Sequence, residues 1–205
     1  MRTRTVLAFA VLSVTAMACA PAASAVEERK SGEMTEAGFW QIVDESARSG
    51  TDQQSQAALL RATLDRLTPR EIEAFADIFE GLMRQSYRWD LWGAGFVVEG
   101  GMSDDGFEYF RRWLISRGKA AFDKVSADPD ALGDIIPHDQ DGDFEFEEFG
   151  YIAREMWAKK TGRDAEAMPS HARPYSQDPS GTPFSEDPAA LSKRYPKLWA
   201  RFGTD

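Results

Sequence analysis

The sequence predicts an all-α protein: a single multi-helix domain of about seven helices, followed by a proline-rich C-terminal strap pinned by aromatic side chains. Three observations lead to this fold class. Helix-start signals stand at Thr35 and Thr68, apolar residues recur at helical spacing through residues 39–157, and no segment alternates with period two for long enough to demand a β-sheet.

Capping patterns and apolar periods predict the first three helices. Thr35, between Met34 and Phe39, has the form of an N-cap inside a hydrophobic staple. The leucines at positions 60, 64 and 67, which are spaced as on one face of a helix, predict a second helix. Thr68 then starts a third helix, because the next residue is proline and a glutamate stands at the third helical position.

The third helical pattern continues to Val97 with a break near Tyr87, and a glycine pair ends it. Ser103 is predicted to cap a further helix that stops at Gly118, and a short helix is expected over residues 119–126. Asp143 is expected to cap the last long helix, whose apolar face is Phe146, Phe149, Ile152, Ala153, Met156 and Trp157.

The chain divides into four predicted segments: a signal peptide (1–25), a linker (26–33), a helical domain (34–162) and a strap (163–205). Six of the ten prolines lie in the last segment, which excludes regular helix over most of it. A disordered tail would be poorer in aromatic residues. We therefore expect an extended strap that packs on the helical domain.

The N-terminus predicts export. Two arginines precede an apolar run over residues 6–18, which is too short to span a bilayer, and Ala-Ser-Ala at residues 23–25 matches a signal-peptide cleavage site. We expect a secreted or extracytoplasmic protein cleaved after Ala25; the alternative is a lipoprotein anchored at Cys19. Since Cys19 is the only cysteine, the mature chain cannot form an internal disulfide.

The charge balance excludes one class of partner. Loss of residues 1–25 removes two arginines and no acid, so the net charge falls from −10 to −12. Such a surface repels nucleic acid and anionic lipid headgroups. We expect no nucleic-acid partner, no membrane span and no cofactor.

The most distinctive segment combines tryptophans with charged residues. It reads Tyr-Arg-Trp-Asp-Leu-Trp-Gly-Ala-Gly from residue 87 and Gly-Gly-Met-Ser-Asp-Asp-Gly-Phe-Glu-Tyr-Phe-Arg-Arg-Trp from residue 100. Together with Phe-Glu-Phe-Glu-Glu-Phe-Gly-Tyr at 144–151 and Tyr-Pro-Lys-Leu-Trp-Ala-Arg-Phe at 195–202, it resembles the bacterial domain-of-unknown-function family 4240 over about residues 34–202. The resemblance implies a helical domain and supplies no catalytic residues. The family generally looks cytoplasmic, so the export signal is a departure.

Asp90 is the most suggestive single residue, because helical counting places it on the stripe that faces the core. A buried carboxylate needs a cation, which Arg88, Arg111 or Arg112 could supply. Asp90 then either pairs with an arginine to fix two helices or serves a ligand or a reaction. The same count puts Trp92 on the open face, so we expect Asp90→Ala to destabilise the protein more than Trp92→Ala.

Two acidic segments contain carboxylates of the kind that bind metal ions, but neither has the pattern of a metal site. Asp104, Asp105 and Glu108 share the start of a helix, where the helix dipole favours acids without any function. Residues 139–143 open like a calcium loop, but Phe144 replaces the required glycine and Gly150 the bidentate glutamate. We expect no metal site.

The residues favour a non-enzymatic binding domain, since no nucleophile pattern is present. Aromatic rings with a few charges suit a peptide, a carbohydrate-like ligand or a protein. The candidate binding residues are Tyr87, Arg88, Trp89, Asp90, Trp92, Asp104, Asp105, Glu108, Tyr109, Arg111, Glu148 and Tyr151. The alternative is a hydrolase that uses paired carboxylates from Asp90, Asp104, Asp105, Glu108 or Glu148.

The export prediction is tested on the N-terminus of the mature protein. Mass spectrometry of protein made in a bacterial host should show a chain that begins at Val26, or at a lipid-modified Cys19. Recovery of the intact chain from Met1 in the cytosol would contradict both forms.

Overall fold

The structure, a computed structural model, describes residues 34–49, 52–137, 144–171, 173–174 and 176–203, which all belong to one unit, Ser31–Asp205. Within these residues it contains nine α-helices and no β-strand, which confirms the predicted all-α class. The signal peptide, the linker and Cys19 lie outside the described residues. None of the described helices has the length and apolar character needed to cross a membrane.

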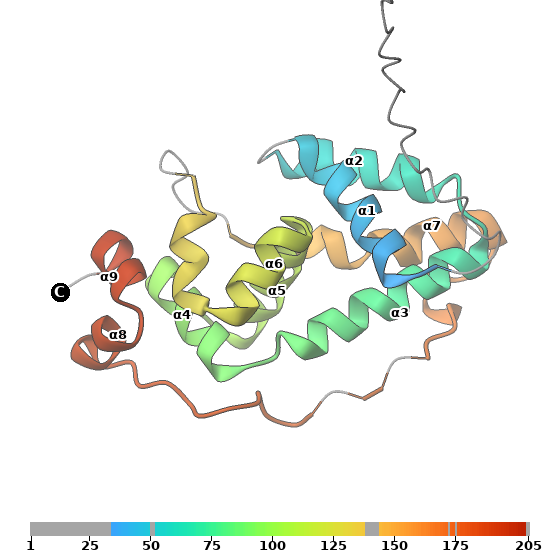
Figure 1. The fold of residues 1–205 in the computed structure, drawn as a ribbon. Coiled ribbons are helices and arrows are strands. Elements are labelled where there is room, and N and C mark those ends of the chain that lie inside the picture. The colour runs from blue at the N-terminus through green and yellow to red at the C-terminus, as the bar shows by residue number, and fades with distance from the viewer. Residues whose placement is uncertain (1–33, 50–51, 138–143, 172, 175, 204–205) are drawn as a thin grey trace, which may run out of the picture. The chain divides into compact units, whose positions relative to one another are not determined.

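Six α-helices follow one another in the first part of the fold (Figure 1): α1 (Glu36–Ser46), α2 (Gln53–Leu64), α3 (Pro69–Gln85), α4 (Trp89–Glu99), α5 (Asp104–Ser116) and α6 (Lys119–Ala127). The predicted caps are present. Thr35 Oγ1 accepts from Gly38 N at 3.1 Å, and Ser103 Oγ accepts from Gly106 N at 3.1 Å. Thr68 and Glu71 form a reciprocal capping box, so α3 begins where the sequence predicts.

The predicted long helix after residue 143 begins later than expected. The chain forms a 3₁₀ turn, η3 (Glu147–Gly150), and only then α7 (Ile152–Thr161). Phe144 and Phe146 are both fully buried, and Phe146 N donates to Tyr109 O of α5 at 3.1 Å. This main-chain contact with α5 holds the segment out of the helix, and Asp143 lies outside the described residues.

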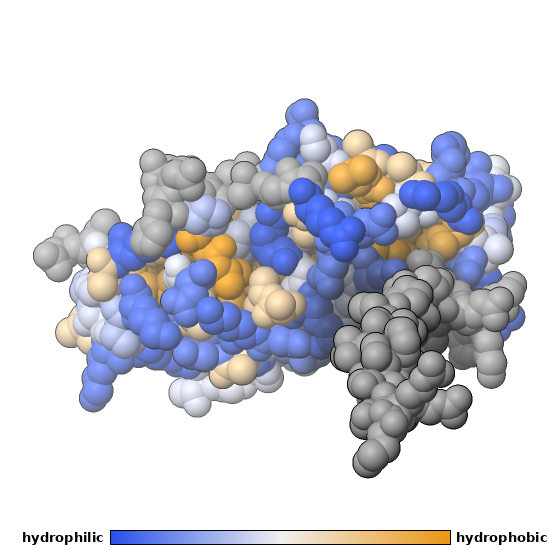
Figure 2. Space-filling model, turned by 45° about the horizontal axis from the view of Figure 1, so that its top comes forward, coloured by the Kyte–Doolittle hydropathy of each residue, from blue (hydrophilic) through white to orange (hydrophobic). Residues whose placement is uncertain are grey.

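Helix α5 lies in the middle of the fold, and every residue from Phe110 to Ser116 is buried. The core around it combines rings from α1, α3, α6 and α7, among them Phe39, Phe75, Phe122 and Trp157. Helix α3 packs mainly against α7, and α1 against α2. On the face drawn in Figure 2, hydrophobic atoms gather in a few patches between hydrophilic side chains. A pocket is therefore a better candidate site than a broad apolar surface on that face.

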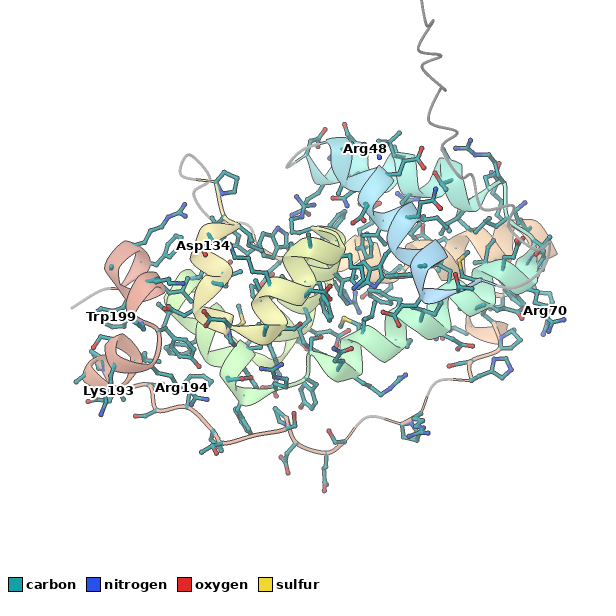
Figure 3. All side chains as sticks on the ribbon, viewed as in Figure 1. Arg48, Arg70, Asp134, Lys193, Arg194 and Trp199 are labelled. Carbon is teal, nitrogen blue, oxygen red and sulfur yellow. The ribbon has the colours of Figure 1, made fainter. Side chains whose placement is uncertain are left out.

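The C-terminal segment is extended at first, as expected, but it ends in two short helices. These are α8 (Pro188–Arg194) and α9 (Pro196–Phe202), which both carry proline at a first-turn position where its missing N–H costs nothing. Lys193 and Arg194 on α8 and Trp199 on α9 lie at the end of the structure away from α1 and α2 (Figure 3). Besides η3, the described residues contain three more 3₁₀ turns: η1 (Ala47–Ser49), η2 (Pro129–Asp134) and η4 (Ala165–Ala167), which follows α7.

Reciprocal polar contacts hold α9 on η2. The buried Asp130 accepts hydrogen bonds from the Lys197 and Leu198 main-chain N–H groups at 3.1 and 3.0 Å and so caps α9 from a distant part of the chain. In return, Arg201 donates to the carbonyl oxygens of Gly133 and Ile136 at 3.0 and 2.7 Å.

The strap runs from η4 past α3 and α4 to α8 (Figure 1). At its start, His171 contacts Asp77 of α3 through both its main-chain N–H and its ring Nδ1, at 2.9 Å each. Further on, Ser180 exchanges main-chain hydrogen bonds with Tyr87 and Trp89 at 2.9 and 3.0 Å. Tyr195 Oη then donates to Asp90 O at 2.8 Å.

A glycine on α4 makes the last of these contacts possible. A Cβ on Gly93 would overlap the Tyr195 hydroxyl and would lie 2.9 Å from the Phe184 ring. Gly93 is therefore required by the strap, and Tyr195 is buried against it. Burial raises the pKa of the Tyr195 hydroxyl to about 12, so this donor keeps its proton further into the alkaline range than an exposed tyrosine.

We expect Gly93→Ala to lower the free energy of unfolding by about 2 kcal/mol, because the added methyl group overlaps the strap. Gly81→Ala on α3 is the matched control. Its Cβ would meet only Arg84 Nη2 at 3.9 Å, so the change should be neutral or stabilising by up to about 1 kcal/mol through helix propensity. Urea denaturation of both variants measures the difference, and equal effects would contradict the packing argument.

Candidate functional site

Stacked aromatic rings join α4 to α5. The rings of Trp89 and Trp92 are parallel within 4°, with centroids 5.1 Å apart, and Trp92 stacks on Phe107 of α5 at 4.9 Å. Trp92 Nε1 also donates to Met102 O at 3.2 Å. The prediction that Trp92 lies on an open face is therefore wrong: Phe107 and Trp89 cover the two faces of its indole.

Arg111 joins α5 to the end of α3. Arg111 as a residue is 4% exposed, its Nη1 donates to Met83 O at 2.6 Å and its Nε to Phe107 O at 3.3 Å. The guanidinium carbon lies 4.9 Å from the ring centroids of both Tyr87 and Phe107. Hydrogen bonds and cation–π contacts thus hold this buried charge in place.

Arg112 points to a different part of the fold, towards η3. It is 8% exposed, pairs with Glu108 one turn earlier, and donates from Nη1 to Glu147 O at 2.6 Å. Its guanidinium lies between the rings of Tyr109 and Tyr151, at 5.3 and 4.7 Å. Burial lowers the pKa of Arg112, but contacts with Tyr151 and Glu108 raise it more, so the net shift is upward.

The packing of Arg112 explains why position 150, in the Glu-Phe-Gly-Tyr part of the segment 144–151, is a glycine. A Cβ at this position would lie 2.6 Å from Cζ and 2.7 Å from Nε of Arg112, so the guanidinium covers the face where a side chain would project. The same contact buries Arg112 Nε, which has no hydrogen-bond acceptor among the described residues.

A pocket of about 330 Å³ lies between α3 and α5. Arg111 and Arg112 lie at its α5 side, and Ser176 of the strap borders it between the strap's contacts at His171 and Ser180. The lining residues are Phe79, Glu80, Met83, Tyr87, Trp92, Asp104, Asp105, Glu108, Arg111, Arg112, Gly150 and Ser176.

The structure brings together about half of the residues selected from the sequence. The pocket contains Tyr87, Trp92, Asp104, Asp105, Glu108 and Arg111. Tyr109 and Tyr151 flank Arg112 instead, and Glu148 lies 2.7 Å from Arg61 of α2 in a surface ion pair. Trp89 packs edge-on against Phe184 of the strap.

Asp90 does not lie on the core-facing side of α4, contrary to the prediction. Its side chain is 34% exposed and forms a two-point ion pair with Arg88, at 2.9 and 2.5 Å. Arg88 also donates to Ser126 O of α6 at 2.8 Å, so the pair ties the start of α4 to α6. Burial raises the pKa of Asp90, but the hydrogen bonds and charge of Arg88 lower it more, and the net shift is downward.

Sequence reasoning missed six of the lining residues: Phe79, Glu80, Met83, Arg112, Gly150 and Ser176. Phe79 and Met83 belong to the apolar period of the third helix, which by itself indicates only a core position, and Ser176 carries no signal of its own. The Arg-Arg pair within the tryptophan-rich segment could have indicated Arg112, because a second arginine on a mostly buried helix also needs partners. Among the described residues, no group of three or more His, Cys, Asp or Glu side chains is arranged to hold a metal ion. The calcium-like residues 139–143 lie outside them.

The observed positions of Trp92 and Asp90 reverse the order in which their substitutions to alanine are expected to destabilise the protein. Trp92→Ala should lower the free energy of unfolding by about 3 kcal/mol, because it removes a ring stacked on two others. Asp90→Ala should cost about 1 kcal/mol, because the ion pair is partly exposed to solvent. Chemical denaturation of both variants measures the order, and a larger effect of Asp90→Ala would contradict it.

The contribution of Asp90 to the free energy of unfolding should also depend on pH. Because its folded-state pKa is lowered, the stabilisation is present above the unfolded value of about 4 and is lost as the pH falls through the folded value. The stability difference between the wild type and Asp90→Asn should therefore be constant near neutral pH and shrink below about pH 4. A difference that grows towards acid would contradict this assignment.

Comparisons with known proteins identify a family without an assigned activity. No curated protein and no solved structure gives a significant match to the chain. A family model covers residues 34–159, from the start of the first helix through most of α7. The resemblance of residues 160–202 stays a prediction. The chain therefore belongs to the family described as "Protein of unknown function (DUF4240)".

Proposed function

We propose that this protein is a non-enzymatic binding domain and that the pocket between α3 and α5 is its binding site. The observation that carries the proposal is the convergence of aromatic, acidic and basic side chains from three helices, α3, α4 and α5, together with η3 and the strap, on one pocket of about 330 Å³. Pockets that combine apolar walls with a few placed polar groups are the usual form of small binding sites.

The pocket is held in shape before any ligand arrives. Main-chain carbonyls of Met83 and Phe107 accept from Arg111, and the carbonyl of Glu147 accepts from Arg112. The aromatic stack of Trp92 on Phe107 supports the adjoining wall. A preformed site loses little conformational entropy on binding, which favours recognition.

The hydrolase alternative has less support. Two of its five carboxylates, Asp90 and Glu148, lie outside the pocket in ion pairs with Arg88 and Arg61. A third, Glu108, borders the pocket but is paired with Arg112. Only Asp104 and Asp105 remain, and both are exposed on the first turn of α5.

We also propose that the binding domain acts outside the cytoplasm, secreted or anchored at Cys19. The basic, apolar and small-residue pattern of residues 1–25 supports export. The candidate ligands are accordingly peptides, carbohydrate-like molecules or proteins of that compartment.

The binding site is tested with an array of short peptides and a set of oligosaccharides, read by thermal shift. Ser176→Trp places a bulky side chain at the pocket and should abolish the shift produced by any hit. Gln177→Trp, at an exposed neighbour that does not line the pocket, should leave the shift unchanged. Hits that are insensitive to Ser176→Trp would contradict this site, and cleavage of a probe, seen by mass spectrometry, would favour the hydrolase.

A further inference from the structure

We infer that the pocket between α3 and α5 takes the cationic side chain of a peptide, a lysine or arginine, and this inference rests on the binding function proposed above. Six charged side chains line the pocket: the carboxylates of Glu80, Asp104, Asp105 and Glu108, and the guanidinium groups of Arg111 and Arg112. Acidic groups therefore exceed basic ones by two.

The two arginines are directed mainly at the protein itself. Arg111 donates to Met83 O and Phe107 O, while Arg112 donates to Glu147 O and pairs with Glu108. An anionic ligand would have to compete with these contacts, because both arginines are buried. The arginines thus form part of the wall of the pocket.

The carboxylates of Asp104 and Asp105 are in a different situation. Both are exposed at the pocket, and neither forms an ion pair with a described residue. They stand at the positive end of α5, but two full charges exceed the half charge of a helix dipole. A cation at the pocket therefore meets a net negative field.

The apolar part of the lining suits the stem of a long basic side chain. Phe79, Met83 and Tyr87 supply apolar surface beside the carboxylates. Lysine and arginine bury their methylene stems along such surface while the charged end meets polar groups. The protein already uses this chemistry for its own cation, since Arg112 lies between Tyr109 and Tyr151 and pairs with Glu108.

The overall charge favours the same class of ligand. The net charge of −10 attracts basic peptides from a distance and repels acidic ones. A cationic side chain is thus supported by the long-range field, by the two exposed carboxylates and by the apolar wall.

The test compares three probes that differ only in the side chain: the N-acetyl methylamides of lysine, norleucine and glutamate. Binding is followed on the full chain by NMR shifts of the Asp104, Asp105 and Glu108 main-chain amides. We expect the lysine probe to bind about tenfold more tightly than norleucine, the glutamate probe to bind least, and added salt to weaken the lysine probe.

The charge requirement is tested with Asp104→Asn/Asp105→Asn, which should weaken the lysine probe about tenfold while norleucine binding stays unchanged. Glu45→Gln/Glu166→Gln removes the same number of charges at exposed residues away from the pocket lining and should change the lysine affinity little. Circular dichroism of each variant confirms that its helix content is preserved.

The outcomes separate this inference from the binding function itself. If norleucine or glutamate binds as well as lysine, or if the aspartate substitutions have no effect, the cationic class is wrong while the pocket remains a binding site. If none of the three probes shifts these amides, the cationic class is also overturned. The proposed function itself fails if the peptide and oligosaccharide arrays yield no hit that Ser176→Trp blocks, or if a probe is cleaved.

Discussion

The structure depends on the burial of α5, a helix that carries three buried rings, those of Phe107, Phe110 and Trp113, and two adjacent arginines. A buried guanidinium needs hydrogen-bond acceptors and polarisable neighbours, because desolvating an unpaired charge costs about several kcal/mol. Since successive residues on a helix point about 100° apart, Arg111 and Arg112 cannot share one set of partners. Arg111 draws in the end of α3, and Arg112 draws in η3.

The candidate site follows from this arrangement. By holding the end of α3 and the turn at Gly150 on two sides of α5, the arginines leave an open space between α3 and α5 that the aromatic residues only partly fill. The acidic first turn of α5 projects at the same place. The pocket is thus a consequence of how α5 is buried, and its charge comes from the part of α5 that reaches the surface.

The C-terminal segment completes the fold through contacts that join distant parts of the chain. Asp130 caps α9 across 67 residues, and Tyr195 reaches the carbonyl of Asp90 across 105. Gly93 admits the Tyr195 hydroxyl, so a small residue on α4 and a ring near the C-terminus depend on each other. These contacts explain why a proline-rich segment with little regular structure stays on the helices.

The sequence by itself determined the fold class and most helix starts, because caps and apolar periods act within one or two turns of the chain. Thr35, Thr68 and Ser103 cap helices as predicted. Only the tertiary structure decided the direction of Trp92 and Asp90, which a helical period across the break at Tyr87 misplaced. It also decided which candidates meet in a pocket, because Arg112, Gly150 and Ser176 come from separate segments and their contact depends on packing that no local pattern encodes.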